Sequence, residues 1–211
     1  MPSNPDGVLD EVASPDPHMP YWATPWPSGI ALAEVVLTRR AALAGRSVLE
    51  LGCGLGITAT ALVEAGADTL AVDCFHEALA YARLNVLRNT SVEPRTLPVD
   101  WRTEEGQRAL GDVEAVVVLA ADVLYEREDI GPLLELGARA LRQGAELWLA
   151  EPGRATSARF VAEARDRGWV GETLQLERVW PAGAGPARVT IHFFRLKAES
   201  AGGCVPDPTG R

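Results

Sequence analysis

The feature that most constrains the fold is a strict alternation of short, apolar, β-rich segments with longer helical segments. The β-rich segments occupy residues 47–52, 69–73, 95–100, 113–120 and 145–151. They are brief and rich in β-branched residues, which is typical of strands buried on both faces. Helical patterns begin at residue 28 and run over residues 57–64, 76–87, 129–141 and 156–167. This alternation predicts parallel strands joined by right-handed crossovers, which form a doubly wound α/β sheet.

The pattern changes after Trp169, where two β-rich segments follow each other without a helix. These segments, GETLQLERVW (171–180) and RVTIHFFRLK (188–197), are separated only by PAGAGPA. A short turn between strands joins them antiparallel. We therefore predict a Rossmann-like sheet of seven mostly parallel strands that ends in a C-terminal antiparallel hairpin. Ser28 is predicted to cap the first helix.

Length and composition indicate one folded domain. A chain of 211 residues, 47% of them hydrophobic, is enough for a single α/β domain. We expect this domain over residues 20–197. Residues 1–19 are predicted to be a flexible leader and residues 198–211 a disordered tail, because both ends are rich in Pro, Gly, Asp and Ser.

Charge and hydropathy limit the classes of partner. The net charge of -9 opposes nucleic-acid binding, so we expect none. No apolar run approaches the roughly 18 residues that span a bilayer, and the start lacks the layout of a signal peptide. Three cysteines form neither a disulfide framework nor a metal motif, and no His/carboxylate cluster predicts a metal. We expect a cytoplasmic enzyme or binding protein without a membrane partner, as a monomer or weak homodimer.

A glycine-rich segment, ELGCGLG (50–56), stands at the end of the first predicted strand. Gly52, Gly54 and Gly56 allow a sharp turn and a close approach of a ligand to the backbone. The dinucleotide fingerprint would need glycine at position 57, where this chain has Ile57, and a phosphate-binding P-loop would need a lysine. The acidic Glu50 instead favours a ligand that carries an amine and a positive charge.

Two further acids follow the next two strands. Asp73 ends the second strand, about 20 residues beyond the glycines, where a carboxylate can bind both hydroxyls of a ribose. Asp100, followed by Trp101, closes the third. Because the carboxyl ends of parallel strands border one crevice, these residues predict a pocket for an adenosine-like group with a cationic amino-acid tail. The alternative reading makes Glu50 a surface acid and Asp73 a turn former.

ELGCGLG, the acid of AVDC, the segment LPVDW and the closing hairpin together resemble class I S-adenosylmethionine-dependent methyltransferases, from about Pro20 to Lys197. The resemblance implies S-adenosylmethionine as cofactor and S-adenosylhomocysteine as product. It places Glu50 and the glycine loop at the methionine part, Asp73 at the ribose, and Asp100 with Trp101 at the adenine. Ala121, at the end of the fourth strand, completes the cofactor-binding set.

The segment ADVLY (121–125) is similar to the D-x-x-Y segment of the family 16 protein-lysine methyltransferases, and EPGR (151–154) resembles their segment after strand five. Asp122 and Tyr125 are therefore candidates for the catalytic site. Asp122 would bind and orient an acceptor amine, with Tyr125 as a hydrogen-bond partner. The alternative makes Asp122 the cap of the next helix, with Tyr125 packed on it.

YWATPWPSG (21–29) resembles the W-P-G-G stretch of the relatives that methylate the electron-transfer flavoprotein β subunit. This resemblance implies that Trp26 contacts the methionine end of the cofactor, while Tyr21 and Trp22 shape the acceptor entrance. In the alternative, the aromatic residues only pin this arm onto the core.

The sequence thus predicts a methyltransferase that acts on an amine, foremost a lysine of a protein substrate. Two alternatives remain open. One is a methyltransferase for the N, O or S atom of a small molecule, and the other is a non-catalytic cofactor-binding protein on the same fold.

Overall fold

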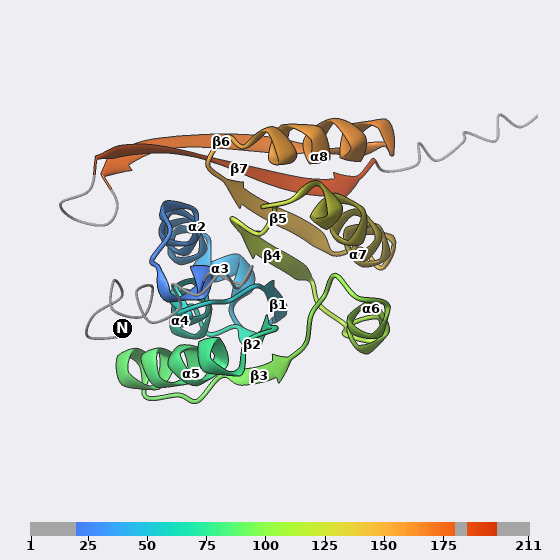
Figure 1. The fold of residues 1–211 in the computed structure, drawn as a ribbon. Coiled ribbons are helices and arrows are strands. Elements are labelled where there is room, and N and C mark those ends of the chain that lie inside the picture. Colours follow the sequence, from blue (N-terminus) through green and yellow to red (C-terminus); the bar gives the residue numbers. More distant parts are fainter. Residues whose placement is uncertain (1–19, 180–184, 198–211) are drawn as a thin grey trace, which may run out of the picture.

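A computed structural model describes residues 20–179 and 185–197. The predicted leader (1–19), the predicted tail (198–211) and most of the hairpin turn lie outside the described residues. The described strands form one seven-stranded sheet in the order β3-β2-β1-β4-β5-β7-β6 (Figure 1). They are β1 (Ser47–Leu51), β2 (Asp68–Asp73), β3 (Arg95–Pro98), β4 (Val117–Ala121), β5 (Glu146–Glu151), β6 (Trp169–Val179) and β7 (Pro186–Leu196).

The pairing of these strands confirms the predicted fold class. β1 pairs in parallel with β2 and β4, and the outer pairs β2–β3 and β4–β5 are also parallel. β7 is antiparallel to both β5 and β6, which makes the predicted C-terminal hairpin. The chain order reverses at β1, where β2 and β3 lie on one side and β4 on the other. In open α/β sheets a ligand crevice forms at such a point.

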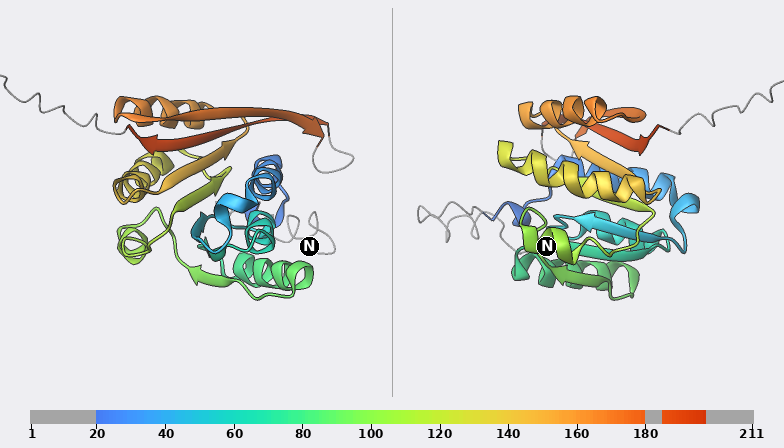
Figure 2. Two further views of the ribbon diagram at one scale, coloured as in Figure 1. Left: turned by 180° about the vertical axis from the view of Figure 1, so that it is seen from behind. Right: turned by 90° about the vertical axis from the view of Figure 1, so that its right-hand side faces the viewer.

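Helices cover both faces of the sheet (Figures 1 and 2). One face carries α2 (Pro27–Thr38), α3 (Arg40–Leu43), α4 (Ile57–Glu64) and α5 (His76–Thr90). The other face carries α6 (Glu104–Ala109), α7 (Ile130–Arg142) and α8 (Ala155–Asp166). Two short 3-10 turns, η1 (Tyr21–Ala23) and η2 (Arg127–Asp129), precede α2 and α7.

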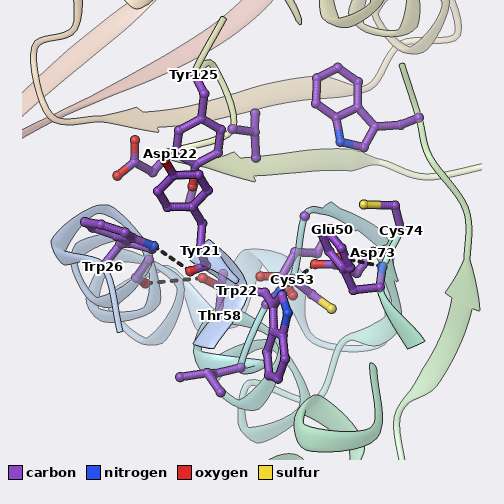
Figure 3. Close-up of a pocket in the computed structure, with 18 of the residues that line it drawn as sticks. Tyr21, Trp22, Trp26, Glu50, Cys53, Thr58, Asp73, Cys74, Asp122 and Tyr125 are labelled. Carbon is purple, nitrogen blue, oxygen red and sulfur yellow. Dashed lines mark hydrogen bonds between the residues drawn. The ribbon is translucent and has the colours of Figure 1, made fainter. Parts of the chain in front are cut away.

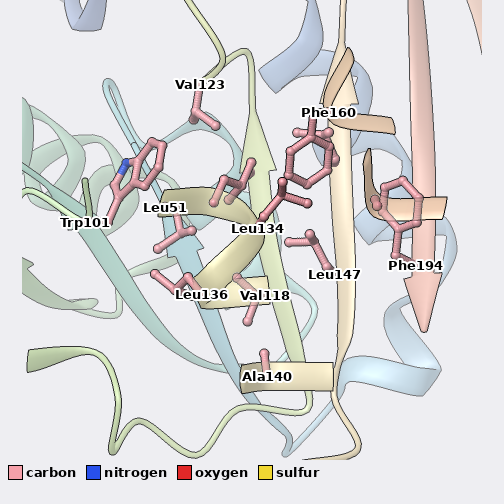
Figure 4. Close-up of a cluster of buried hydrophobic side chains, with 14 of the residues drawn as sticks. Leu51, Trp101, Val118, Val123, Leu134, Leu136, Ala140, Leu147, Phe160 and Phe194 are labelled. Atoms are coloured by element: carbon pink, nitrogen blue, oxygen red, sulfur yellow. The ribbon is translucent and has the colours of Figure 1, made fainter. Parts of the chain in front are cut away.

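Alternate residues of the central strands feed two separate cores. Leu147 and Leu149 of β5 pack with α7 and α8 (Figure 4), whereas Trp148 and Ala150 pack with α2 and α4. This alternation follows from the two-residue period of a strand. Apolar side chains thus pack on both faces of the sheet. This packing holds the strands in place, and with them the positions of their carboxyl ends.

The start of α2 differs from the predicted cap. The helix begins at Pro27, and the extended residue before it, Trp26, occupies the N-cap without a side-chain hydrogen bond. Proline suits this first helical position because its missing N–H would have no partner there. Ser28 lies inside the first turn, is fully buried, and its hydroxyl has no hydrogen-bond partner among the described residues. The prediction that Ser28 caps the helix is therefore wrong.

The fourth strand is shorter than predicted. It begins at Val117 rather than at residue 113. The N–H of Val113 donates to the carbonyl of Leu110, which holds the chain in the turn after α6. Val113 and Ala115 are apolar because, from the segment between α6 and β4, they pack against the buried cluster that contains Leu136 and Ala140 of α7. The third strand also ends at Pro98, two residues before the predicted end, and it lies at an edge of the sheet.

Among the described residues, no helix combines the length and the apolar character that crossing a membrane requires. The longest helix, α5, has 15 residues, and its exposed face carries charged side chains.

Candidate active site

A pocket of about 240 Å³ lies at the carboxyl ends of β1, β2 and β4 (Figure 3). This is the edge where the order of the parallel strands reverses. Twelve of the thirteen predicted cofactor, catalytic and entrance residues line it: Tyr21, Trp22, Trp26, Glu50, Gly52, Gly54, Asp73, Asp100, Trp101, Ala121, Asp122 and Tyr125. The thirteenth, Gly56, is not among the lining residues.

The glycine loop turns the chain from β1 into α4. Gly52, Gly54 and Gly56 all have positive φ, at 66°, 50° and 74°. This region of backbone conformation favours glycine because a Cβ would crowd the chain. A Cβ on Gly54 would also stand 3.2 Å from the carbonyl oxygen of Trp22. The loop therefore presents bare backbone to the pocket, with the arm of residues 21–26 across it.

Gly56 has a packing role at the start of α4. A Cβ there would lie 2.8 Å from the Cα of Ala82 on α5. The N–H of Gly56 donates to the carbonyl of Cys53, which closes the turn before the helix. The glycine thus allows α4 and α5 to approach closely, and its proposed contact with a ligand stays a prediction.

Glu50 is a buried acid with one free oxygen. Its side chain projects from β1 into the pocket, the residue is 4% exposed, and its Oε2 has no hydrogen-bond partner among the described residues. Burial raises the pKa of Glu50 to about 8, and a hydrogen bond with Thr58 opposes this rise only in part. An uncompensated acid in a pocket indicates a ligand that brings a cation or a donor.

Asp73 fixes the second side of the glycine loop. Its Oδ2 accepts from the N–H of Gly54 at 2.9 Å, and its Oδ1 accepts from the N–H of Phe75 at 3.0 Å. Burial raises the pKa of Asp73, while these backbone donors act in the opposite direction. The carboxylate therefore links the ends of β1 and β2. Asp73 also lines the pocket, where its oxygens can accept from a ligand hydroxyl.

Asp100 is held by its neighbour Arg102. The guanidinium donates from Nε to Oδ1 at 2.8 Å and from Nη2 to Oδ2 at 2.9 Å. Desolvation acts to raise the pKa of Asp100, but the contacts with Arg102 outweigh it and the pKa is lowered. Trp101 turns away from solvent and is only 6% exposed, at the edge of the α7 core. Asp100 and Trp101 thus form a fixed wall beyond Asp73.

The opposite end of the pocket is built around Asp122. This residue has φ of 54°, one of two positive values among the described non-glycine residues. Asp and Asn adopt this conformation at lower cost than other side chains. The Asp122 carboxylate is 3% exposed and accepts from Nε of Arg154 at 2.9 Å. Asp122 does not cap the next helical turn, because Glu126 and Asp129 form that capping box.

Tyr125 is the centre of a stack of side chains. Its ring lies on Tyr21 with centroids 5.2 Å apart and planes at 18°. The guanidinium of Arg154 lies on Tyr125, 5.1 Å from the ring centroid. Burial raises the pKa of the Tyr125 phenol, and the charge of Asp122 raises it further. The phenol therefore remains a neutral hydrogen-bonding group through the physiological range.

We call the region of Glu50, Gly52, Gly54 and Asp73 the glycine-loop end of the pocket. The region of Tyr21, Asp122 and Tyr125 is the tyrosine end. Both ends open into the same cavity (Figure 3).

Trp22 and Trp26 are divided between these two ends. Backbone atoms of Trp22 lie beside Gly54, and its ring is 5.6 Å from that of Tyr81 on α5. The indole N–H of Trp26 donates to the carbonyl of Tyr21 at 2.8 Å, and the two rings are 6.3 Å apart. Trp22 therefore lies at the glycine-loop end and Trp26 beside Tyr21 at the tyrosine end. The predicted contacts of Trp26 with the methionine end of the cofactor and of Trp22 with the acceptor stay predictions.

Comparisons with known proteins agree with this geometry. Residues 49–149 match a family model described as a methyltransferase domain. This match starts within β1 and ends within β5, so it contains the glycine loop, Asp73, Asp122 and Tyr125, whereas Tyr21 precedes it. Residues 49–149 are therefore similar to a methyltransferase domain.

Two curated relatives of this chain are lysine methyltransferases by name. The electron transfer flavoprotein β-subunit lysine methyltransferase of Xenopus laevis is 34% identical over 139 residues, which cover 64% of this chain and 54% of the relative. The mouse protein-lysine N-methyltransferase EEF2KMT is 33% identical over 139 residues, which cover 59% and 41%. The chain thus spans about half the length of the curated relatives that it matches.

A solved structure shares the fold of this chain. The magnesium protoporphyrin IX methyltransferase of Synechocystis, solved with bound S-adenosylmethionine, aligns with a TM-score of 0.60 at 17% identity. The alignment covers 90% of this chain and 96% of that one. At this level of identity the comparison establishes the fold.

Three residues that shape the pocket are not among the residues predicted from the sequence. Thr58 hydrogen-bonds with Glu50, Arg102 holds Asp100, and Arg154 pairs with Asp122. Arg102 stands two residues after Asp100, so its short-range pairing had a sequence signal. Arg154 lies 32 residues from Asp122, and its only signal was its place in EPGR at the end of β5.

Proposed function

We propose that the protein transfers a methyl group from S-adenosylmethionine to an amine, the side chain of a lysine in a protein substrate. The observation that carries the cofactor assignment is the uncompensated carboxylate of Glu50, buried beside bare glycine backbone. The names of the two relatives support lysine as the acceptor.

The residues of the glycine-loop end fit this cofactor. The free Oε2 of Glu50 suits the ammonium of the methionine tail, and an approaching cation would favour the ionised acid. Asp73 retains acceptor capacity for the ribose hydroxyls, and Asp100 with Trp101 lies beyond it for the adenine. When bound, the cofactor supplies a methyl carbon on a sulfonium sulfur, which keeps the electron pair of the broken C–S bond.

At the tyrosine end the protein has to align the acceptor and control its proton. The amine nitrogen forms the new N–C bond with its lone pair, so it has to be neutral when it reacts. An unperturbed lysine has a pKa near 10.4, so a neutral amine at pH 7 costs about 4 to 5 kcal/mol. The pocket wall of Tyr21 and Tyr125 removes water from the amine, which lowers its pKa. Asp122 and Tyr125 orient the nitrogen, and its extra proton leaves to water.

Methyl transfer to proteins can be tested without knowing the substrate. The protein is incubated with methyl-labelled S-adenosylmethionine and a lysate of the source organism, and macromolecules are separated from small molecules. We expect label on a protein band, and methyl-lysine after hydrolysis of that band. Asp73→Asn, with its weakened cofactor site, is the matched control and should give little label.

Two outcomes would contradict this proposal. Label confined to the small-molecule fraction would assign the activity to a metabolite instead. If calorimetry shows no binding of S-adenosylmethionine, the protein does not use this cofactor, and both the protein-lysine and the metabolite methyltransferase are excluded.

A further inference from the structure

The Asp122 carboxylate has a cation within the protein itself. Arg154 reaches it from the loop after β5, with Nε 2.9 Å from Oδ1. The side chain of Asp122 is 3% exposed and that of Arg154 is 37% exposed, so the pair runs from the protein interior to the surface. Arg154 is not among the residues that line the pocket, and it reaches the acceptor site only through Asp122 and Tyr125.

The two loops that meet in this ion pair are tied together at a second point. The hydroxyl of Thr156 donates to the carbonyl of Leu124 at 2.7 Å. Their strands are neighbours, because Ala121 at the end of β4 pairs in register with Ala150 on β5. Arg154 also covers one side of Tyr125, whose other side lies on Tyr21. The guanidinium of Arg154 is thus held by Asp122 and Tyr125 of the loop after β4, and the hydrogen bond from Thr156 to Leu124 holds the two loops together.

A carboxylate that faces an acceptor amine creates a chemical difficulty. A nearby negative charge raises the pKa of an amine and keeps it as an ammonium, which has no lone pair for the new bond. Burial strengthens this effect, since the charges are poorly screened there. Without a counter-charge, Asp122 would bind the acceptor tightly in its unreactive form.

We propose that Arg154 is a positioning residue that cancels the charge of Asp122, so that the acceptor amine docks against this carboxylate as the neutral nucleophile. This inference rests on the proposed amine methyltransferase function and adds to it how the site sets the protonation of its substrate.

The other charges around the tyrosine end are already engaged or distant. Asp129 accepts from the N–H groups of Tyr125 and Glu126, and Glu151 pairs with His192 behind the loop after β5. The charged and titratable groups that face this end from the surrounding elements are Tyr21, Glu50, Asp73, Arg102, Asp122, Tyr125, Glu126, Asp129, Glu151, Arg154 and His192.

The first test measures the pH dependence of a single turnover. The probe is Nα-acetyl-lysine amide at saturating concentration, with S-adenosylmethionine bound to the enzyme. The rate should rise with pH as the amine loses its proton. Loss of the positive charge in Arg154→Gln should move this rising limb of the pH–rate profile about one pH unit to the alkaline side, so turnover at neutral pH should be roughly tenfold slower. Arg154→Lys keeps the charge and should hold the limb near its wild-type position.

A double variant separates charge from shape. Asp122→Asn combined with Arg154→Gln removes both charges, so the limb should return toward the wild-type pH even if the rate is lower. A limb that stays displaced in the double variant would overturn the cancellation of charge.

The second test measures binding without turnover. Calorimetry with n-butylamine is carried out on the protein saturated with S-adenosylhomocysteine. Because Asp122 without its partner attracts ammonium, Arg154→Gln should bind total amine several-fold more tightly than the wild type at neutral pH, with a flatter pH dependence. A merely structural defect would instead weaken both binding and turnover.

Arg159→Gln is the matched control. Arg159 lies on the exposed surface of α8 and pairs with Glu163, so this variant should behave as the wild type in both tests. If the wild type methylates the probe but Arg154→Gln shows no displaced limb, the role of Arg154 is overturned and the proposed function stands. If the wild type binds S-adenosylmethionine but transfers no methyl to any amine, the amine acceptor itself is overturned.

Discussion

Glu50 at the glycine-loop end and Asp122 at the tyrosine end are both buried carboxylates, and they differ in their partners. Glu50 has an oxygen without any partner in the described part of the chain, whereas Asp122 is paired with Arg154. The first arrangement is costly until an external cation arrives, which suits a permanent binding site for a cationic cofactor. The second is already balanced, which suits an acceptor that has to arrive or react without its proton.

The largest expected effect is the loss of cofactor affinity when Asp73 is changed, because this residue connects the end of β2 to the glycine loop. Asp73→Asn replaces a carboxylate oxygen by an amide that cannot accept, so it loses hydrogen bonds with the ribose hydroxyls and with the loop. Hydrogen bonds to a charged group contribute about 1.5 to 3 kcal/mol each. Calorimetry should therefore show a loss of cofactor affinity of about 100-fold or more.

The control for this variant lies on the same strand. Asp68 stands at the opposite end of β2, is exposed and pairs with Arg95. Asp68→Asn should leave cofactor affinity unchanged. Equal affinity of Asp73→Asn and the wild type would show that the glycine-loop end does not hold a ribose.

The next effect is a pH dependence of the free energy of unfolding, which we expect from Glu50 because one of its oxygens has no partner among the described residues. The pKa of Glu50 is raised from 4.5 to about 8, so the folded protein binds more protons than the unfolded chain between these pH values. The cofactor-free protein should thus lose stability as pH rises from about 4.5 to 8. Glu50→Gln removes this loss and should be more stable than the wild type at pH 8, by on the order of 2 to 4 kcal/mol, with the difference vanishing below the unfolded-state pKa of 4.5.

Thermal unfolding at a series of pH values measures this difference. The same variant should bind the cofactor about tenfold or more weakly, because the amide cannot balance an ammonium. Glu64→Gln, on the exposed end of α4, is the control and should show no pH-dependent gain. A stability difference for Glu50→Gln that is constant between pH 5 and pH 8 would mean that Glu50 is not a desolvated acid.

The two ends also differ in how far they could be predicted from the sequence. Most of the glycine-loop end lies in one strand–turn–helix unit, β1 to α4, and only Asp73 comes from the end of β2. The alternation of β-rich and helical segments that predicts the fold also predicts where these strands end. The turn chemistry of Gly52 and Gly54 and the acid before them are therefore visible in a single stretch. The tyrosine end depends on Arg154 and Asp122, which are 32 residues apart, and no periodic pattern connects them.

The errors at the level of elements have similar physical causes. Ser28 has a side chain that is suited to an N-cap, but α2 already begins at Pro27, which has no N–H that would need a partner. Val113 is apolar because it packs from a turn, which a strand pattern cannot distinguish. The short helix α6 was missed, although Thr103 caps it through the N–H of Gly106 and two acids occupy its first turn. Those residues are a usable helix-start signal.

A smaller effect is expected at the tyrosine end, because its carboxylate acts on the acceptor and not on the cofactor. Asp122→Asn keeps a side chain that tolerates φ of 54°. It should raise the acceptor concentration for half-maximal rate by about tenfold. Cofactor affinity should change less than about threefold. Asp122→Ala adds backbone strain of roughly 1 kcal/mol and should also lower the melting temperature. A matching loss of cofactor affinity in Asp122→Asn would place this residue at the cofactor instead.

The smallest expected effects come from the two tryptophans, and these variants test the boundary between the two ends. The ring of Trp22 packs on Tyr81 and holds the backbone of Trp22 beside Gly54, so the smaller ring in Trp22→Phe should loosen this contact and weaken cofactor binding a few-fold with little effect on the acceptor. Trp26→Phe removes the indole N–H that holds the carbonyl of Tyr21. Tyr21 is then less fixed against Tyr125, so the acceptor should bind a few-fold more weakly at unchanged cofactor affinity. Calorimetry for the cofactor and the initial rate at varied acceptor concentration separate the two variants. The resemblance of the sequence alone assigned Trp26 to the methionine end, so the reverse pattern would restore that assignment and move the boundary of the glycine-loop end across the arm.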